Sequence, residues 1–316
     1  MNVQRKSILL IAGLAVASAA IAAPQAAQAF SWNYGMDSSA DGTGLLFGTT
    51  NKYGVGLNSH YEAFGMAYTA NEDTVTFAFN ANFGINGSSY SRAADGNIGW
   101  GDMFLNLDPS KNFTDSKAAR SVLGIRFAAT NDSGIAAGET GIYSGISTMN
   151  VTQTNSGWSS YSDYNNYVSR NRGQVELIDG MSTAEAQGYL GSHGQNVLSS
   201  GTKVGDITVL DKTTLSGMGL DFGSQGGQNG AEVLGFSFAR SLLPGGELNW
   251  IAHVMAECSN DTVGMSGDFA AVPPPVPNTP GQPPKETEST PEPGTILGGI
   301  VAVTSIFKAK KHAKKA

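Results

Sequence analysis

Short runs in which hydrophobic and polar residues alternate recur along the middle of the chain. In residues 73–82, Val75, Phe77 and Phe79 fall on one side, whereas Thr74 and Thr76 fall on the other. A period of two residues is typical of a half-buried β-strand. The same alternation predicts strands at 61–69, 73–82, 103–107, 122–128, 142–152, 203–210, 232–239 and 250–258.

Turn-forming pairs separate these runs. They are Asp41-Gly42, Asn86-Gly87, Asp95-Gly96, Asn229-Gly230 and Pro244-Gly245. Such pairs tolerate a positive φ or fix φ near −65°, so they favour tight turns. Many short strands with little helix between them predict an all-β fold, an antiparallel β-sandwich with jelly-roll-like topology.

Two short helices are predicted in the least strand-like region, residues 153–200. Ser182 to Leu190 begins with an N-cap serine and has Glu185 three residues later, the arrangement of a capping box. Ser160 to Arg170 places Tyr161, Tyr164 and Val168 at helical spacing. We expect this region to be an excursion between the two sheets.

The N-terminus has the layout of a secretory signal peptide. Arg5 and Lys6 precede an uncharged apolar run at 8–23, and Ala27-Gln28-Ala29 forms a cleavage motif before Phe30. Ala20-Ile21-Ala22 is a second possible cleavage site, and an uncleaved N-terminal anchor is the alternative. Cleavage after Ala29 would make signal peptidase a transient partner.

Three segments follow one another at the C-terminus. Residues 273–293 hold nine of the twelve prolines, which favour an extended, semi-rigid spacer. Pro291-Glu292-Pro293-Gly294 follows, then 13 uncharged residues at 295–307 and five lysines. A membrane-spanning helix needs about 20 apolar residues, so we expect only transient membrane contact here. The lysines match the positive charge found on the cytoplasmic side of membrane segments.

These features divide the chain into a signal peptide at 1–29, a β-sandwich domain at 30–270, a proline-rich linker at 271–290 and a C-terminal segment at 291–316. The signal peptide holds two of the 19 basic residues and the lysine tail holds five, and neither holds an acidic residue. The rest of the chain therefore has 12 basic and 26 acidic residues, a net charge of −14. This charge argues against binding to nucleic acid.

The order of the C-terminal parts resembles the PEP-CTERM sorting signal of Gram-negative bacteria. The resemblance rests on Pro291, Glu292, Pro293 and Gly294, followed by the apolar run and the lysine tail. It implies that an exosortase, an integral membrane protease, recognises the motif and releases the protein to the envelope or the exterior. The apolar run is short, which affects durable anchoring more than sorting.

Several spaced motifs in the predicted domain resemble a cyanobacterial family of exosortase-dependent surface proteins. The motifs are Trp32-Asn33-Tyr34, the stretch from Ala94 to Asp102, Gly124 to Ala128, Asn131 to Gly134 and Glu257 to Asp261. The resemblance implies export and sorting to the cell surface. It implies no enzymatic chemistry.

A glycine-rich loop carries the strongest candidate metal ligands. Asp95, Asn97 and Asp102 could present oxygen ligands to Ca²⁺, although their spacing does not match an EF-hand loop. Asn131-Asp132 and Asn260-Asp261 are weaker candidates. The alternative is a cluster of β-turns in which Asp and Asn bond to nearby backbone.

Aromatic residues suggest a second kind of site. Trp100, Trp158, Tyr161 and Tyr164, with Tyr167, could stack on sugars, because β-sandwiches of this type often bind carbohydrate. Exopolysaccharide would then be a partner. The competing interpretation is that these rings pack in the core.

Catalytic patterns are weak. Gly264-Met265-Ser266-Gly267 is followed by Asp268, so a nucleophile elbow is incomplete. The histidines lack metal-ligand spacing, and His253 is predicted to lie on the polar face of its strand. Cys258 is the single cysteine, is predicted to be buried and has no partner for an intramolecular disulfide.

The sequence therefore predicts an exported, exosortase-sorted cell-surface or extracellular-matrix protein without catalytic activity. The first alternative is a carbohydrate-binding module assisted by calcium. The lesser alternative is an envelope hydrolase, since two carboxylates suffice for a glycosidase but nothing in the sequence selects a pair.

Overall fold

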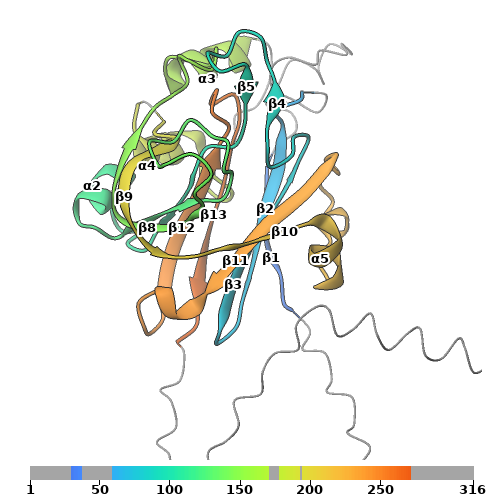
Figure 1. Ribbon diagram of the computed structural model, residues 1–316, viewed down its shortest axis with the longest axis vertical. Helices are drawn as coiled ribbons and strands as arrows, with labels where there is room; N and C mark the ends of the chain where they lie inside the picture. The colour runs from blue at the N-terminus through green and yellow to red at the C-terminus, as the bar shows by residue number, and fades with distance from the viewer. Residues whose placement is uncertain (1–29, 38–58, 171–177, 193, 272–316) are drawn as a thin grey trace, which may run out of the picture. The chain divides into compact units, whose positions relative to one another are not determined.

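A computed structural model describes residues 30–37, 59–170, 178–192 and 194–271 (Figure 1). All described residues belong to the first of two units, Met1–Val272, and the second, Pro273–Ala316, lies entirely outside the described residues. The predicted sorting motif at Pro291–Gly294 and the alanines Ala27 and Ala29 also lie outside them. Phe30 is the first described residue and is exposed.

Two antiparallel sheets make up the fold, which confirms the predicted all-β sandwich. One sheet has five strands in the order β1 (Asn33–Met36), β2 (Ala63–Ala70), β3 (Thr74–Ala81), β11 (Glu232–Ala239) and β10 (Thr208–Leu210). The other has six strands in the order β13 (Thr262–Phe269), β12 (Leu248–Met255), β6 (Met103–Asn106), β7 (Val122–Arg126), β8 (Gly141–Met149) and β9 (Val197–Gly205). A small hairpin pairs β4 (Ser88–Ser89) with β5 (Asn97–Ile98).

The chain passes from one sheet to the other three times. It does so between β3 and β6, between β9 and β10, and between β11 and β12. The prediction of a single strand at 203–210 is therefore wrong. Strand β9 ends at Gly205 and β10 begins at Thr208, and the two strands belong to different sheets. The alternation also missed β1 and β13, whose glycines interrupt the hydrophobic pattern.

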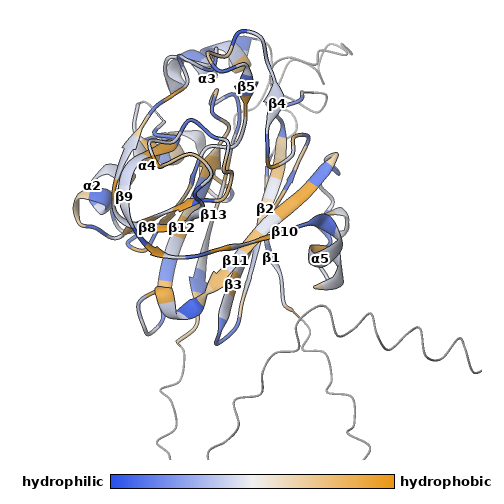
Figure 2. Ribbon diagram, in the orientation of Figure 1, coloured by the Kyte–Doolittle hydropathy of each residue, from blue (hydrophilic) through white to orange (hydrophobic). Residues whose placement is uncertain are grey.

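A large aromatic core fills the space between the sheets. Trp100 stacks on Phe83 with a centroid distance of 4.2 Å, and Phe79 stacks on Phe127 at 5.2 Å. Trp250 stacks on Phe269 at 5.1 Å. Figure 2 shows the hydrophobic stretches concentrated in strands such as β10, β11 and β12. Burial of this apolar surface is the main source of stability in a chain with one cysteine.

Helices cover the outer face of the six-stranded sheet. They are α2 (Phe113–Ala118), α3 (Tyr161–Arg170) and α4 (Thr183–Leu190), and their buried residues form a second hydrophobic cluster with Phe104, Ile251 and Met255. Both predicted helices are confirmed, and Ser182 and Glu185 form the predicted capping box. The prediction that residues 153–200 form an excursion between the two sheets is wrong, because α3 and α4 connect β8 to β9 within one sheet.

The five-stranded sheet has a smaller outer cover. Helix α5 (Lys212–Gly217) and the short 3₁₀-helix η1 (Phe222–Gln225) place Leu215 and Phe222 against Ala67 and Ala78. Figure 1 shows α5 on the opposite side of the sandwich from α2 and α4. A further 3₁₀-helix, η2 (Arg240–Leu242), follows β11.

Strand β12 is buried on both faces, and this changes the position of His253. Trp250, Ala252 and Val254 face the core between the sheets, as their alternation predicts. Ile251 and His253 face the helices instead. The prediction that His253 lies on a polar face is wrong, because α2 and α4 cover that face and leave the histidine 0% exposed.

Candidate functional site

The sequence motifs at 94–102, 124–128 and 131–134 meet around the ends of β6, β7 and β9. Arg126, at the end of β7, donates from Nε to Asn131 Oδ1 at 2.9 Å and from Nη1 to the Ala136 carbonyl at 2.6 Å. Asn131 Nδ2 in turn donates to Asp102 Oδ1 at 2.8 Å, and the Leu198 N–H donates to Asp102 Oδ2 at 2.6 Å. The guanidinium thus holds the β7–β8 loop from inside.

Glu257, just after β12, joins the same region. Its Oε2 accepts from the Gly99 N–H at 2.6 Å and its Oε1 accepts from the Asp132 N–H at 2.5 Å. Asn155 Nδ2 donates to Asp132 Oδ2 at 2.8 Å, and Asn196 Nδ2 donates to the Glu257 carbonyl at 2.7 Å. We call this set, with Arg126, Asn131 and Asp102, the loop clamp.

Burial raises the pKa values of both carboxylates in the loop clamp. It raises the pKa of Asp102 to about 6, against the hydrogen bonds from Leu198 and Asn131 and the charge of Arg126, which lower it. It raises the pKa of Glu257 to about 7, against the N–H groups of Asp132 and Gly99. Each carboxylate has both oxygens occupied by protein donors, so the arrangement favours a structural role.

The predicted calcium loop is divided between the surface and this clamp. Asp95 Oδ1 accepts from the Asn97 N–H at 2.9 Å, and Asn97 Nδ2 donates to the Asn86 carbonyl at 3.2 Å. These are the turn contacts of the alternative interpretation. Asp102 is 0% exposed, and its oxygens point to Asn131 and Leu198 rather than to the turn.

Most of the predicted sugar-stacking residues are buried. Trp100 lies in the core between the sheets, and Tyr161 and Tyr164 lie on the buried face of helix α3, in the second cluster. Their ring faces are covered by protein, so these three residues cannot stack on a sugar in this conformation. Trp158 is partly exposed and packs on Tyr167, with a centroid distance of 4.6 Å. Of the residues predicted to stack on sugars, only these two are accessible to a ligand.

A group of three carboxylates that the sequence did not single out forms the best candidate metal site. Asp37 follows β1, Glu62 precedes β2 and Asp261 precedes β13. One oxygen from each lies within 4.8 Å of the other two, and Glu62 and Asp261 are buried. Asp261 alone was noted in the sequence, beside Asn260. No local spacing could have predicted the group, because three separate strand ends bring it together.

Asp261 also ties this group to the backbone. Its Oδ2 accepts from the Ala63 N–H at 2.5 Å and its Oδ1 accepts from the Thr262 N–H at 2.7 Å. Burial raises the pKa of Asp261 to about 7, although these two donors lower it. Carboxylates this close do not all ionise without compensation, so a proton or a cation must neutralise part of the charge. Ca²⁺ prefers carboxylate and carbonyl oxygens, and these three residues could supply part of its ligand set.

At a pH above the pKa of Asp261, repulsion among the three carboxylates is largest. Under this condition we expect millimolar Ca²⁺ to raise the melting temperature (Tm) of the protein. A ligand that binds only the folded state stabilises it by about 2.7 kcal/mol at 100 times its Kd. Differential scanning fluorimetry with Ca²⁺, Mg²⁺ and a chelator would measure the shift. Asp37→Asn should remove the shift, whereas Asp73→Asn, at an exposed acid, should keep it. An unchanged Tm for the wild type would contradict binding of Ca²⁺ at this group.

Other chemical groups lie apart from this site. Cys258 is buried, as predicted, and burial raises the pKa of its thiol to about 12, which makes it a poor nucleophile. His60 is exposed, and His193 lies outside the described residues. Within the described residues, no helix has the length and hydrophobicity needed to cross a membrane.

Comparisons with known proteins give no match: no family model, curated protein or solved structure is similar to this chain.

Proposed function

We propose that this chain is an exported cell-surface or extracellular-matrix protein, that an exosortase sorts it through the C-terminal segment, and that the β-sandwich acts without catalysis. One observation carries the proposal: a signal-peptide pattern precedes the domain, and the order Pro-Glu-Pro-Gly, apolar run and lysine tail follows it. This order suits a protein that is cut near Pro291 and leaves its lysines in the membrane-associated remnant.

The loop clamp supports a structural role for the motifs shared with the surface-protein family. Arg126 and Glu257 bond to backbone groups of neighbouring loops, and the Asn131 side chain links Arg126 to Asp102. Residues that carry the resemblance thus hold loops together within the domain, which supports a structural role for them. Signal peptidase and an exosortase are the partners that this proposal implies.

We expect the protein recovered from the exterior of its native host to begin near Phe30 and to end near Pro291. Changing Pro291, Glu292 and Pro293 together to alanine should prevent the C-terminal cut, so that the five lysines remain in the intact mass. The matched control changes Pro283, Pro284 and Glu286 in the linker, which has the same residue types. Intact-mass spectrometry of the envelope and exterior fractions would measure both ends.

Two results would contradict the proposal. Wild-type protein that keeps Lys308–Lys315 would exclude processing near the motif. Equal processing of the motif variant and the linker control would show that Pro-Glu-Pro is not the recognised element.

A further inference from the structure

A lysine, a threonine and a glutamine lie in hydrogen-bond contact where helix α2 meets strands β8 and β9. Lys117 of α2 donates from Nζ to Thr148 Oγ1, and the Thr148 hydroxyl donates to Gln195 Oε1 at 3.2 Å. Thr148 lies in β8, and Gln195 lies two residues before β9. All three residues are half-buried. An amine, a hydroxyl and a side-chain amide are thus neighbours, and none of them belongs to the loop clamp or to the three-carboxylate group.

Backbone contacts hold Thr148 and Gln195 beside each other. Next to them, the Asn196 N–H donates to the Met149 carbonyl at 3.2 Å. Asn196 Oδ1 accepts from the Val151 N–H at 3.0 Å. The carbonyl carbon of the Gln195 side chain is bonded to the oxygen that the hydroxyl contacts. Two groups that are held in place in this way react with a smaller loss of entropy than free groups do.

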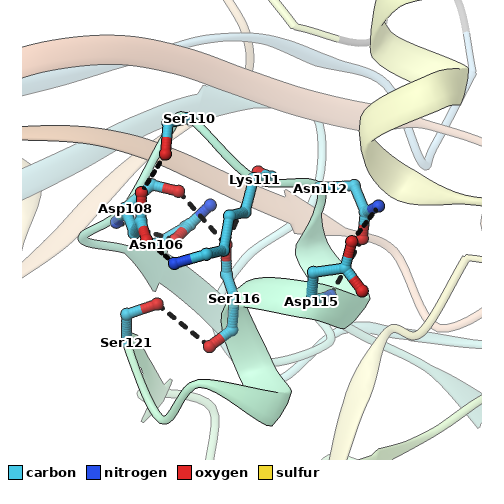
Figure 3. A network of polar contacts seen from close by, with 8 residues as sticks. All are labelled: Asn106, Asp108, Ser110, Lys111, Asn112, Asp115, Ser116 and Ser121. Atoms are coloured by element: carbon cyan, nitrogen blue, oxygen red, sulfur yellow. Dashed lines mark hydrogen bonds and ion pairs between the residues drawn. The ribbon is translucent and has the colours of Figure 1, made fainter.

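The helix that carries Lys117 is also restrained (Figure 3). Asn112 Oδ1 caps α2 by accepting from the Asp115 N–H at 2.9 Å. Ser116, the neighbour of Lys117 in the chain, donates from Oγ to the Asp108 carbonyl at 3.1 Å. These contacts fix the start of α2 and the loop before it, and so restrain the position from which the lysine amine reaches β8.

The surroundings of Lys117 favour a basic amine. Burial lowers the pKa of Lys117, so the neutral form is more populated than in a fully solvated lysine. Within the described part of the chain, Lys111 and Lys203 form ion pairs with carboxylates, whereas Lys117 is in none. A neutral lysine in contact with a hydroxyl can take its proton and activate it as a nucleophile.

We propose that Thr148 and Gln195 become joined by an intramolecular ester, with Lys117 as the base. Neutral Lys117 Nζ takes the proton from Thr148 Oγ1, and Oγ1 forms a bond to Cδ of Gln195. The Cδ–Nε2 bond then breaks, and Nε2 receives the proton from Lys117 and leaves as ammonia. One C–O bond replaces one C–N bond without oxidation or reduction, so the step needs no other reactant.

The ester joins the two ends of the segment that carries helices α3 and α4. Thr148 and Gln195 are 47 residues apart in the sequence, and both helices lie between them. A covalent link across so long a segment restricts the unfolded chain and thereby stabilises the folded one. The inference does not depend on the sorting signal, so either proposal can fail while the other stands.

Mass spectrometry of the purified full chain tests the proposal. We expect an intact mass that is lower, by one ammonia, than the mass calculated from the sequence. A protease digest should contain the peptide with Thr148 joined to the peptide with Gln195, and hydroxylamine, which cleaves esters, should separate the two. Loss of ammonia at an Asn-Gly pair would give the same intact mass, so the joined peptides are the decisive observation.

Two variants with matched controls separate the nucleophile from the base. Thr148→Val keeps the shape of the side chain but removes the hydroxyl, so no joined peptides should form and the melting temperature should fall. Lys117→Arg keeps the charge but does not release its proton. The fraction joined at a fixed time after synthesis should therefore be lower by about tenfold or more. Thr202→Val and Lys212→Arg, at exposed positions, should behave as the wild type does.

Each contrary result overturns the inference. A wild-type digest without joined peptides would show that the ester does not form. Conversion of Gln195 to glutamate without a link to Thr148 would exclude a lasting cross-link. Joined peptides in Thr148→Val would place the bond at another residue. Equal joined fractions in Lys117→Arg and Lys212→Arg would show that Lys117 is not the base.

Discussion

Replacing Arg126 with methionine is expected to lower the free energy of unfolding by about 3–5 kcal/mol. The guanidinium is 1% exposed and donates to backbone carbonyls of residues 129–136 as well as to Asn131 Oδ1. Methionine keeps the apolar length of the side chain but leaves those acceptors buried without donors. It also removes the positive charge that lowers the pKa of Asp102. Urea denaturation at constant pH would measure the loss.

Two further variants separate the hydrogen bonds from the charge. Arg126→Lys keeps the charge but cannot reach several carbonyls at once, so we expect a loss nearly as large as that for methionine. Arg92→Met changes an exposed arginine and should alter the free energy by less than about 0.5 kcal/mol. A loss for Arg126→Met no larger than that for Arg92→Met would show that the β7–β8 loop is held by other contacts.

The free energy of unfolding should fall as the pH rises from about 4 to about 7. Asp102, Glu257 and Asp261 have pKa values raised to about 6, 7 and 7, so the folded state binds their protons more tightly than the unfolded state does. Their contribution to the free energy of unfolding is fully present below the pKa values that these carboxyl groups have in the unfolded state. It is lost as the pH rises through the pKa values that they have in the folded state. Each such group changes the free energy by about 1.4 kcal/mol per pH unit within its window.

His253 acts in the opposite direction over part of this range. Its pKa is lowered to about 3, so below its ordinary value of 6.5 the unfolded state takes up a proton that the folded state excludes. Three carboxylates outweigh one histidine, and we expect a net slope of about 1–3 kcal/mol per pH unit. Denaturant titrations across the range would measure it.

Glu257→Gln provides the control for this slope. The variant should be less stable overall, because the amide nitrogen faces a backbone N–H, but its slope should be shallower by the contribution of one group. Glu232→Gln, at an exposed position, should keep the wild-type slope. A free energy of unfolding that rises with pH over this range would contradict the raised pKa values.

Local patterns were enough to predict much of the fold. The alternation at 73–82 corresponds to β3, and the capping box of Ser182 and Glu185 begins α4, because both signals depend on neighbours in the chain. β12 shows the limit of such patterns. Trp250, Ala252 and Val254 were assigned correctly to the core, but a single polar residue such as His253 does not reveal that helices cover the second face.

The candidate sites depended on contacts between distant segments. The motifs at 94–102 and 131–134 were recognised in the sequence, but their partnership with Arg126 and Glu257 follows from the order of β6, β7 and β12 in the sheet. Asp37, Glu62 and Asp261 carry no shared local signal, since each lies at the end of a different strand. Trp100 was proposed to line a sugar-binding surface, but an aromatic ring suits a hydrophobic core equally well. Its residue type alone does not distinguish these two roles.

The loop clamp takes the place of disulfides in this domain. Small exported domains often use disulfides to restrain their loops, whereas here Arg126 and Glu257 restrain them through buried hydrogen bonds. With a single cysteine, the chain cannot form an intramolecular disulfide, so folding of the domain needs no thiol oxidase or disulfide isomerase. The raised pKa values of its buried carboxylates make stability depend on pH instead, and we expect a larger free energy of unfolding near pH 4 than near pH 7.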